Sequence, residues 1–575
     1  MISATLPSCL PASSASCRRH PSRNVSLSAH ASIPGAQVSS SPPFRWHRAM
    51  PSEHRAQLTR CKSASEDSKQ SSPANVGPVS SEAGQKPPQG SDGVVPEPLT
   101  TLSPAKPLPL LLTLAAGLLV LIVPRPEALT PQAWQLLALF LSTITGIVLQ
   151  PLPTGAVAII ALAVGVASNI LSWSAAFAAF SAEVPWLIAA AMFIAQGFRK
   201  TGLGERLAFT MVVAMGRWGS VGLAYGLVAA EALLSPMIPS VAARAGGVLL
   251  PITVSLAEAA GSRPSDGTEN RLGSYLVSSV YQGSVVSSAM FLTANHPNPL
   301  SAQLALATVG VTLGWGTWAL AAILPGLLSL LLMPLLLHKL FPPEADDIDT
   351  AGAQAAAQQQ LQELGTFSAP EATMSLVLMG TLVLWVGGHS IGVSPGLAAL
   401  GGLSALLVTG VLSWDDCLSC KGAWNTLTWF AALIALSGAL KSSGIVSYFS
   451  DWVASGVASL GLGWELSFGI LLFVYISSHV FFASNIAHVS AMLAAFLGVA
   501  VAAGAPASLA AITFACFSNM MGGFTPYGMS HAPMYFGSGY VSTKKWWAVG
   551  LCALALNLAV WLTAGVAWWK VIGLW

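Results

Sequence analysis

The amino-acid sequence predicts an all-α membrane protein, a polytopic bundle of inverted repeats with broken helices. Three observations predict this fold class: charge is scarce, long apolar segments recur, and the two halves of the chain resemble each other. Of the 575 residues, 54% are hydrophobic and only 8% are charged, whereas an average soluble domain is about 25% charged. Such a chain cannot cover a water-facing surface of ordinary polarity, so we expect a lipid bilayer to be much of its solvent. The net charge of +2 and the lack of a basic stripe give no reason to expect a nucleic-acid partner.

The first hundred residues have the composition of a leader. Residues 1–52 contain 13 serines, five arginines and no acidic residue, and residues 53–100 remain polar. This segment cannot bury enough apolar surface to offset its chain entropy, so we expect residues 1–100 to be disordered. Arginine and serine without acidic residues are typical of an organelle transit peptide, and the prolines disfavour the amphipathic helix of the mitochondrial kind. We expect a cleaved plastid transit peptide, and an uncleaved disordered tail is the alternative.

Apolar segments follow at lengths that suit a bilayer, which needs about 20 residues per helix. The expected spans are 107–123, 131–150, 153–171, 184–198, 220–260 (interrupted), 272–292, 310–340, 372–388, 394–413, 426–440, 464–504 (interrupted), 507–524 and 546–569. Residues 341–371 are polar and rich in acidic side chains. We expect a loop there, between a first membrane repeat at 101–340 and a second at 372–575.

The two halves of the membrane part share three segments in the same order. The matched segments are 185–208 with 427–450, 235–251 with 481–496, and 287–299 with 518–533, at offsets of 242, 244 and 232 residues. Repeats with interrupted spans at matching places are typical of secondary transporters, whose substrate site lies at the repeat interface. Chance similarity between apolar segments is the alternative, which three ordered matches disfavour.

Each repeat contains one apolar span that its sequence interrupts. Pro236 and Pro239 cannot donate backbone hydrogen bonds, so the helix over 220–260 must break there. A break at membrane depth is tolerated only where the freed backbone faces protein or a water-lined cavity. The helix that begins near Ser240 would direct its unpaired N–H groups into that cavity, which favours an anion. The second repeat has the same arrangement from Ser484.

Each broken span also carries one potential cation at the same offset. Arg244 follows Ser240 by four residues, and His488 follows Ser484 by four, so each pair would share a helix face. An arginine at mid-span costs about 2.5–3.5 kcal/mol and normally faces a partner or a cavity. We expect Arg244 to contact substrate or a gate, and pairing with Glu231 is the alternative. His488 is either a donor in the site or a core histidine with a protein partner.

Two short segments, Thr293–Asn298 and Thr525–Gly528, interrupt helices at mid-membrane depth. Their hydroxyls and carbonyls can hold a carboxylate or a cation, and a plain helix-ending turn is the alternative. Cys417 and Cys420 form a CxxC without a second Cys/His pair, so a plain loop, a redox pair or a metal role stays open. The sequence has no HExxH, paired intramembrane aspartates or GxSxG with a partner, so we expect no enzyme. A channel remains an alternative to a transporter.

At these motifs the chain resembles the divalent anion/sodium symporter family, and within it the plastid 2-oxoglutarate/malate translocators. The resemblance runs from about 107 to 575, and its most specific segments are 288–300 (SAMFLTANHPNPL), 537–541 (GSGYV) and 567–575 (AWWKVIGLW). It implies two re-entrant hairpins, each with a Ser-Asn-Thr signature that binds the dicarboxylate at its tip. It also implies a homodimer whose transport domains move as elevators.

The signatures of this chain depart from the family pattern. Residues 240–244 read SVAAR and lack both middle polar groups, and residues 484–488 read SNIAH and lack the threonine. Residues 525–527 read TPY where this branch has Thr-His-Tyr. Each lost group removes a hydrogen bond worth about 0.5–1.5 kcal/mol. The identity of the anion therefore stays open.

The resemblance and the residues together predict exchange of dicarboxylates of the malate/2-oxoglutarate class across the plastid inner envelope. The expected substrate-binding residues are Ser484, Asn485 and His488 for one carboxylate, Ser240 and Arg244 for the other, Thr293 and Thr525 at the floor, and Asn298 and Pro526 beside them. We expect no cofactor; sodium is not expected to be required, because fixed positive groups can replace it. Transport of another anion such as sulfate and sodium-coupled dicarboxylate symport are the alternatives.

Overall fold

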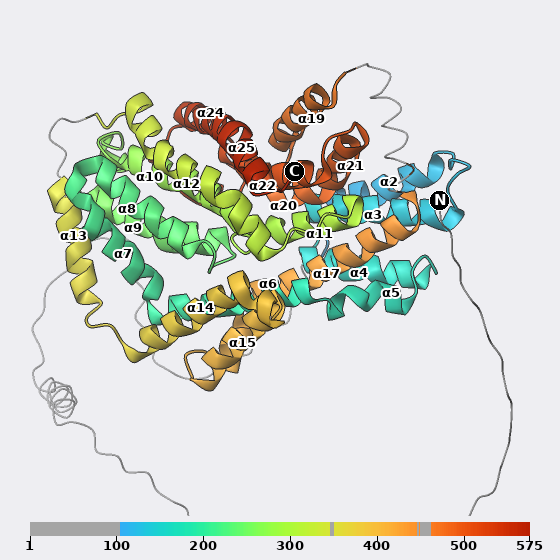
Figure 1. Ribbon diagram of the computed structural model, residues 1–575, viewed down its shortest axis with the longest axis horizontal. Coiled ribbons are helices and arrows are strands. Elements are labelled where there is room, and N and C mark those ends of the chain that lie inside the picture. The colour runs from blue at the N-terminus through green and yellow to red at the C-terminus, as the bar shows by residue number, and fades with distance from the viewer. Residues whose placement is uncertain (1–103, 345–349, 446–447, 449–461) are drawn as a thin grey trace, which may run out of the picture. The chain divides into compact units, whose positions relative to one another are not determined.

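The computed structural model describes residues 104–344, 350–445, 448 and 462–575 (Figure 1). The expected leader, residues 1–100, lies outside these residues. In the first half the helices are α2 (Pro107–Ile122), α3 (Pro131–Leu149), α4 (Thr154–Ala167), α5 (Trp173–Phe177), α6 (Glu183–Thr201), α7 (Leu203–Met215), α8 (Gly219–Leu234), α9 (Leu250–Ala259), α10 (Gly273–Met290), α11 (Pro297–Val309) and α12 (Trp315–Leu340).

The second half continues with helices of similar length. They are α13 (Thr350–Glu363), α14 (Ala369–Gly387), α15 (Pro395–Val408), α16 (Trp414–Ser419), α17 (Lys421–Ser442), α19 (Trp464–Ser478), α20 (Asn485–His488), α21 (Ala494–Ala502), α22 (Ala507–Met520), α23 (Ala532–Gly537), α24 (Thr543–Val560) and α25 (Val566–Val571). Three further segments are π-helical: η3 (Ala242–Leu249), η7 (Val489–Leu493) and η9 (Trp561–Gly565). The 3-10 segments are η1 (Ala178–Ser181), η2 (Gly216–Trp218), η4 (Pro264–Asp266), η5 (Gly388–Ile391), η6 (His479–Phe481) and η8 (Met521–Gly523).

Many of these helices suit a membrane. In the described chain eight helices are long and apolar enough to cross one, or nine if the bent pair Trp173–Ser181 and Glu183–Thr201 is a single span. Four shorter apolar helices accompany them, at Pro107–Ile122, Thr154–Ala167, Pro395–Val408 and Ala507–Gly523. The predicted all-α membrane architecture is thus confirmed.

The segment between the repeats differs from expectation, and helices α7 and α11 lie outside the expected spans. Residues 350–363, inside the expected polar loop, form helix α13. The segment consists largely of alanine and glutamine, which favour helix, and it packs on α7 and α9. Ala353 and Ala357 are fully buried there, and Gln354 Nε2 donates to the carbonyl of Val213 at 3.0 Å. The expected loop is thus a helix over 350–363, because the helix propensity of its alanines and glutamines outweighs the polarity of the segment.

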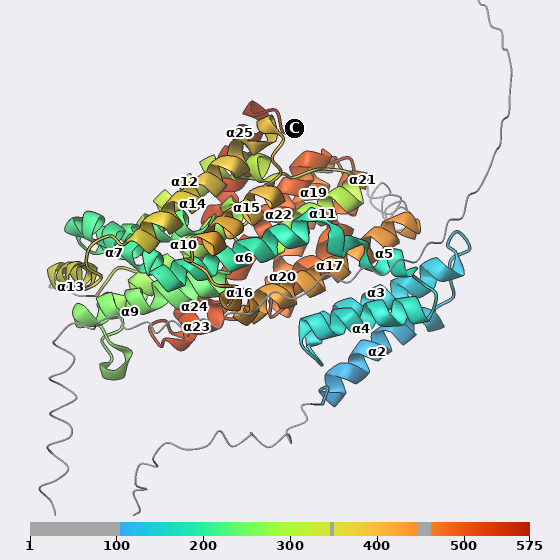
Figure 2. The ribbon, with the colours of Figure 1, turned by 90° about the horizontal axis from the view of Figure 1, so that it is seen from below.

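The helices form two packed groups. The frame helices, which we define as α4, α6, α14, α15 and α17, pack on one another, and α2 and α3 join them beside α4 (Figure 2). The central helices, which we define as α8–α12 and α19–α24, include α10, a helix whose residues are all buried and which packs against α8, α9, α12 and α22. The boundary between the two groups includes contacts of α11 with α17 and of α12 with α14.

Each repeat folds its broken span into a hairpin. In the first, α8 leads to a tip at 235–240, from which η3 and α9 return. In the second, α19 and η6 lead to a tip at 482–484, from which α20, η7 and α21 return. Both returning arms contain a π-helical stretch close to the tip. Such stretches interrupt regular helix geometry and frequently lie at functional sites.

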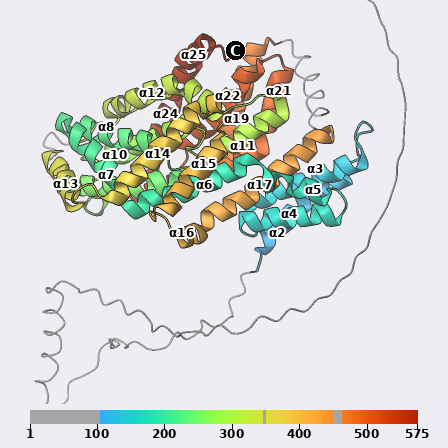
Figure 3. The same cartoon turned by 60° about the horizontal axis from the view of Figure 1, so that its bottom comes forward.

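The equivalent helices α6 and α17 pack side by side in opposite directions (Figure 3). Near the end of α6, Lys200 Nζ contacts Asp416 Oδ2 at 2.6 Å, just before α17 begins. At the other end, a cavity of about 630 Å³ is lined by Ala175, Ala178 and Ala179, just before α6, and by Gly438, Ala439, Ser442 and Ser443, at the end of α17. The two repeats are therefore inverted relative to each other.

Candidate functional site

The first hairpin tip exposes backbone carbonyls that the broken helix cannot satisfy. The carbonyl of Pro236 accepts a hydrogen bond from Thr293 Oγ1 at 2.7 Å, and that of Ile238 accepts one from Arg244 Nη1 at 2.6 Å. The Ser240 hydroxyl accepts from the backbone N–H of Ala243 at 3.3 Å, which caps the returning arm. Because α8 ends before this tip, these carbonyls have no helical N–H partner, and the side chains of Thr293 and Arg244 satisfy them.

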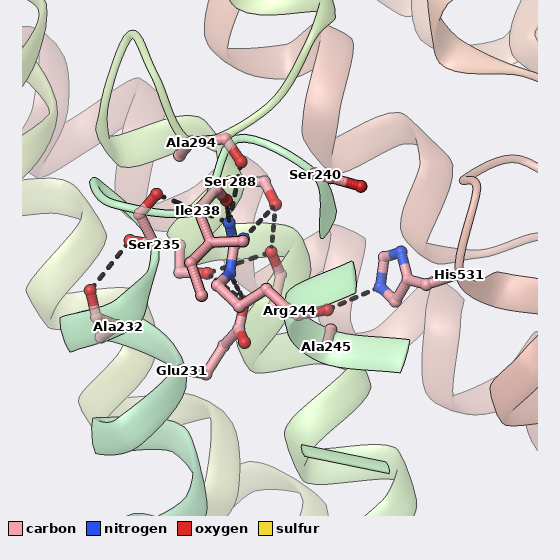
Figure 4. A network of polar contacts seen from close by, with 12 residues as sticks. Glu231, Ala232, Ser235, Ile238, Ser240, Arg244, Ala245, Ser288, Ala294 and His531 are labelled. Carbon is pink, nitrogen blue, oxygen red and sulfur yellow. Dashed lines mark hydrogen bonds and ion pairs between the residues drawn. The ribbon is translucent and has the colours of Figure 1, made fainter. Parts of the chain in front are cut away.

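Arg244 is completely buried at the base of this tip (Figure 4). Its Nε donates to Oε1 of Glu231 at 2.7 Å. Its other nitrogens donate to the carbonyls of Ile238 (2.6 Å), Ala294 (3.0 Å) and Ser235 (3.5 Å) and to Ser288 Oγ (3.3 Å). The Ser240 hydroxyl points away from this network. Arg244 therefore ties the first tip to the loop that follows α10.

For Arg244, contact with substrate or a gate stays a prediction. The structure has the alternative arrangement, in which Arg244 pairs with Glu231 and both side chains are fully buried. The Ser287 hydroxyl also donates to Glu231 Oε1, at 3.0 Å. The charges of the pair cancel, so Arg244 offers no net charge to an anion and every donor contact above is to protein. Its contribution to the site is to position the carbonyls of the tip.

The loop after α10 is held by both of its predicted site residues. Thr293 Oγ1 donates to the carbonyl of Pro236 and accepts from Trp315 Nε1 at 3.1 Å. Asn298 Nδ2 donates to two carbonyls at the end of α10, at 2.7 and 2.8 Å. Both side chains are buried, and the hydrogen bonds above are all to protein groups. They shape the first half of the site.

Three asparagines join the two repeats. Asn295 Nδ2 donates to Asn519 Oδ1 at 2.7 Å, and Asn519 Nδ2 donates to Asn298 Oδ1 at 2.7 Å. We call this set the asparagine bridge. Next to it, Gln282 Nε2 on α10 donates to the carbonyl of Gly523 at 2.8 Å. The loops after α10 and α22, which carry Thr293 and Thr525, are thereby placed next to each other.

The second hairpin tip is built around two histidines. His488 Nε2 lies 2.8 Å from the hydroxyl of Ser478 on the opposite arm. The ring of His479 stands edge-on to that of His488, with 5.2 Å between centroids, and its Nε2 lies 3.2 Å from the carbonyl of Gly528. Ser484 is the N-cap residue of α20, and its hydroxyl makes no capping bond. The second tip thus packs on the loop after α22, as the first packs on the loop after α10.

Several polar groups at the second tip have no protein partner. Among the described residues, Asn485 Nδ2, His479 Nδ1, His488 Nδ1 and Thr525 Oγ1 are buried and make no hydrogen bond. An unsatisfied buried group costs about 1–3 kcal/mol, so such a cluster is typical of a binding site. Gly528 borders it, because a Cβ at that position would press on the Thr525 hydroxyl and on His479 Nε2. Pro526 lies half-buried in the same loop.

The two halves of the site therefore differ. In the first half Arg244, Thr293 and Asn298 are satisfied by protein, Ser240 lines a cavity, and Glu231 Oε2 and His296 Nε2 are buried without a hydrogen bond to any described residue. In the second half the groups that could receive a ligand remain free. Sequence reasoning named Asn485, His488 and Thr525 but did not distinguish the two halves.

Four polar residues that contribute to this region were not predicted as site residues. Glu231 entered only as an alternative partner, and Asn295, Asn519 and His479 were not considered. The signal that identifies them is a polar or ionisable side chain inside an otherwise apolar span, which is costly unless it has a function or a partner.

Comparisons with known proteins agree with this architecture. Residues 105–575 match the family model described as the sodium:sulfate symporter transmembrane region. The chain is 51% identical over 467 residues to "Dicarboxylate transporter 1, chloroplastic" of Arabidopsis thaliana, which covers 81% of this chain and 83% of that protein. It is 50% identical over 467 residues to the protein of the same name from Spinacia oleracea, over 81% of this chain and 82% of that protein.

A solved structure shows the same fold at low sequence identity. The crystal structure of the YdaH transporter of Alcanivorax borkumensis matches with a TM-score of 0.51 and 14% identity. The match covers 72% of this chain and 90% of that one. At this identity the likeness concerns the fold alone.

Proposed function

Because this chain belongs to the family of the sodium:sulfate symporter transmembrane region, the divalent anion/sodium symporters, we propose that it exchanges small dicarboxylates across the plastid inner envelope. The chain is a transporter and not an enzyme. Relatives about 50% identical over most of its length are named chloroplastic dicarboxylate transporters, which supports both the substrate class and the plastid location. Malate and 2-oxoglutarate are the members of this class that we propose.

The observation that carries the proposal is the meeting of the two hairpin tips with loops that the asparagine bridge joins. Each tip packs against the loop of its own repeat, and the loops contact each other through Asn295, Asn298 and Asn519. Each repeat thereby holds the start of a helix beside its own loop, and the second repeat adds buried polar groups without a partner in the described chain. Helix amino termini and N–H donors bind carboxylates without requiring a full positive charge.

We place the two carboxylates of the substrate unequally. One accepts hydrogen bonds at the second tip, from Asn485, Thr525 and the N–H groups at the start of the helix Asn485–Ala502. The other lies toward Ser240, whose hydroxyl points away from the Arg244 network. No cofactor takes part in this proposal, and sodium is not required. Neutral donors and helix termini supply the attraction, since Glu231 cancels the charge of Arg244.

Reconstitution in liposomes tests the function. Labelled malate should enter vesicles loaded with malate or 2-oxoglutarate and should not accumulate in empty vesicles. The rate should be equal with sodium and with potassium outside. Accumulation in empty vesicles driven by an inward sodium gradient would show symport instead of exchange.

Sulfate is the competing substrate, because the signatures at 240–244 and 484–488 lack hydroxyl and amide groups that the family pattern contains. Unlabelled sulfate, malate, 2-oxoglutarate and citrate should be compared as inhibitors of labelled malate exchange. Malate and 2-oxoglutarate should compete most strongly. Strong inhibition by sulfate alone, together with sulfate exchange, would show that the substrate is an inorganic anion.

The location, the oligomeric state and the lipid environment belong to the same proposal. Residues 1–100 fused to a fluorescent protein should direct it into plastids, and a cytosolic signal would contradict a transit peptide.

The detergent-solubilised chain should elute with the mass of a homodimer after correction for bound detergent and lipid. The Leu-rich exposed surface of helices such as α2 supports a surrounding bilayer.

A further inference from the structure

The equivalent helices α6 and α17 end in the same way. Arg199 lies just before the end of α6, and Lys441 just before the end of α17. A glycine with positive φ follows in each case, Gly202 at 74° and Gly444 at 78°. The offset of 242 residues that aligns the glycines also aligns Arg199 with Lys441. Each repeat therefore carries a cation at the C-terminal end of this helix.

These two cations lie at opposite ends of an antiparallel pair. Helix α17 has 22 residues, which at 1.5 Å per residue gives roughly 33 Å, close to the thickness of the hydrocarbon core. The end of α6 meets the start of α17 through the contact of Lys200 with Asp416. Arg199 is consequently near one membrane face and Lys441 near the other.

A cavity of about 360 Å³ opens beside Arg199, between the end of α6, the start of α17 and the first hairpin tip. Arg199 and Lys421 line it, are exposed, and are in no ion pair within the described residues. Ser240 of the hairpin tip is also part of its wall. No aspartate or glutamate is among the described residues that line it. Arg199 donates to Gln196 Oε1 and keeps its charge, so this cavity connects two cations without an ion pair to a residue of the proposed binding site.

A second cavity, of about 310 Å³, opens beside Lys441 between α17 and α11. Lys441 is exposed, donates to the carbonyl of Leu306 on α11 at 3.3 Å, and is in no ion pair in the described part of the chain. The residues that α17 contributes are Ile434, Ser437, Gly438 and Lys441, and those that α6 contributes to the first cavity are Met192, Ala195, Gln196 and Arg199, each 242 positions earlier. The same four positions of the repeat thus build one cavity at each end of the pair.

Charge placed in this way acts on an approaching anion. Clefts with walls of low dielectric constant focus the field of the charges that line them and raise the local concentration of an oppositely charged solute. Exposed charges act over roughly 8 Å at physiological ionic strength, so a cation must lie in the vestibule itself to act on an anion there. Arg244 cannot supply this attraction, because Glu231 neutralises it. The attraction at first contact must come from residues outside the binding site.

We propose that the two cavities are anion-capture vestibules, one at each membrane face. Arg199 and Lys421 attract the divalent anion from one compartment, and Lys441 attracts it from the other. The inference rests on the proposed function in naming a dicarboxylate as the captured anion. Its charge requirement holds for any divalent anion of similar size. Exchange needs capture from both compartments, and the inverted duplication supplies a vestibule for each.

The test measures transport from each side separately. Arg199→Gln, Lys421→Gln and Lys441→Gln are reconstituted in liposomes in one orientation, selected through a tag at the carboxyl terminus. KM is measured for external malate at saturating internal malate, and then the reverse. Arg199→Gln and Lys421→Gln should raise KM on one side by about 3- to 10-fold, and Lys441→Gln should raise it on the other side only. Vmax should change less than twofold in each case, and added salt should shrink the differences.

Matched variants make the result specific. Arg199→Lys and Lys441→Arg keep the charge and should keep the KM. Lys339→Gln removes an exposed cation at the end of α12, outside both cavities, and should change neither side. Equal changes on both sides, changes on the same side for Arg199→Gln and Lys441→Gln, or a loss of Vmax alone would overturn the proposal. If the wild-type chain exchanges sulfate and not malate, the proposed function fails, and the variants are compared with labelled sulfate; a side-specific shift still supports the vestibules and its absence overturns them.

Discussion

At the scale of single residues, the buried pair of Arg244 and Glu231 governs the first hairpin tip. An arginine alone at mid-span costs about 2.5–3.5 kcal/mol, and a carboxylate within 2.7 Å removes the net charge. The planar guanidinium has five donors in a rigid fork, which suits it to several fixed acceptors. Here they reach the carbonyls of Ile238 and Ala294 on two different loops. The ion pair thus holds the backbone of the first tip against the loop after α10.

Breaking this pair should destabilise the protein strongly. Arg244→Gln or Glu231→Gln leaves one uncompensated buried charge, so each should lower the free energy of unfolding by about 3–5 kcal/mol. Thermal unfolding of the detergent-solubilised chain measures the effect. The double variant Glu231→Gln/Arg244→Gln should cost less than the sum of the single changes. Additive effects would show that the two side chains do not act as a pair.

The sequence identified these positions but could not assign their partners. The spacing of Ser240 and Arg244 follows from helix geometry, whereas the choice between a cavity and Glu231 depends on how the two arms of the hairpin pack. Thr293 and Thr525 are equivalent in the repeat alignment. The Thr293 hydroxyl bonds to the carbonyl of Pro236 and to Trp315 Nε1, whereas the Thr525 hydroxyl has no hydrogen bond within the described residues.

The free hydroxyl of Thr525 depends on the glycine beside it. In Gly528→Ala the new methyl group would press on Thr525 Oγ1 and on His479 Nε2. Overpacking of this kind costs about 1–3 kcal/mol and would fill space that we assign to the substrate. Malate exchange should fall at least tenfold while the chain remains folded by size-exclusion chromatography.

Gly537→Ala is the matched control for this change. Nothing lies within 4 Å of a Cβ at Gly537, so exchange should remain near the wild-type rate. Equal activity of Gly528→Ala and Gly537→Ala would show that no substrate group approaches Gly528.

At the scale of elements, the sequence predicted most spans and both interruptions. The first interruption follows from Pro236 and Pro239. The second has no proline between Phe481 and Ser484, and only the repeat alignment revealed it. The π-helical stretches η3 and η7 could not be predicted, because they result from how the returning arms pack near the tips.

The asparagine bridge connects elements of different repeats and can be tested at that scale. Asn519→Leu removes both hydrogen bonds and leaves the amides of Asn295 and Asn298 buried without their partner. Since a lost partner costs about 1–3 kcal/mol per buried group, the variant should unfold at a lower temperature and exchange malate at least tenfold more slowly. Thermal unfolding and exchange rate are measured together. Normal values for both would show that the bridge is dispensable.

Thr513→Val is a suitable comparison for that experiment. Thr513 lies on the same helix, is also fully buried, and donates only to the carbonyl of Leu509 in its own helix at 2.7 Å. Its loss should have a smaller effect on both measurements, because no contact between the repeats is removed.

At the scale of the whole molecule, the chain combines a buried polar centre with an apolar exterior. Large hydrophobic side chains are exposed on the outer helices, for example Ile122 at 77% on α2 and Leu376 at 75% on α14. Polar residues such as Gln282 and Asn519 are nearly completely buried. This inversion of a soluble protein's pattern agrees with the composition, which predicted lipid as the solvent. The sequence could not predict which helices belong to the frame helices and which to the central helices, because all of them are similarly apolar.

The part of the chain from Thr100 onward should transport without the preceding residues. The family model matches residues 105–575. A chain that begins at Thr100 should therefore show the exchange rate of the full-length chain in liposomes. A rate below one half of it, at equal amounts of folded protein, would assign a role in transport to the leader.

The asparagine bridge also makes each half of the chain depend on the other. A product of half the gene would carry Asn519 without Asn295 and Asn298, or the reverse, and would bury amides that nothing satisfies. Either half expressed alone should therefore be stable only together with the other half, placed in the opposite orientation, because only the other half satisfies these amides.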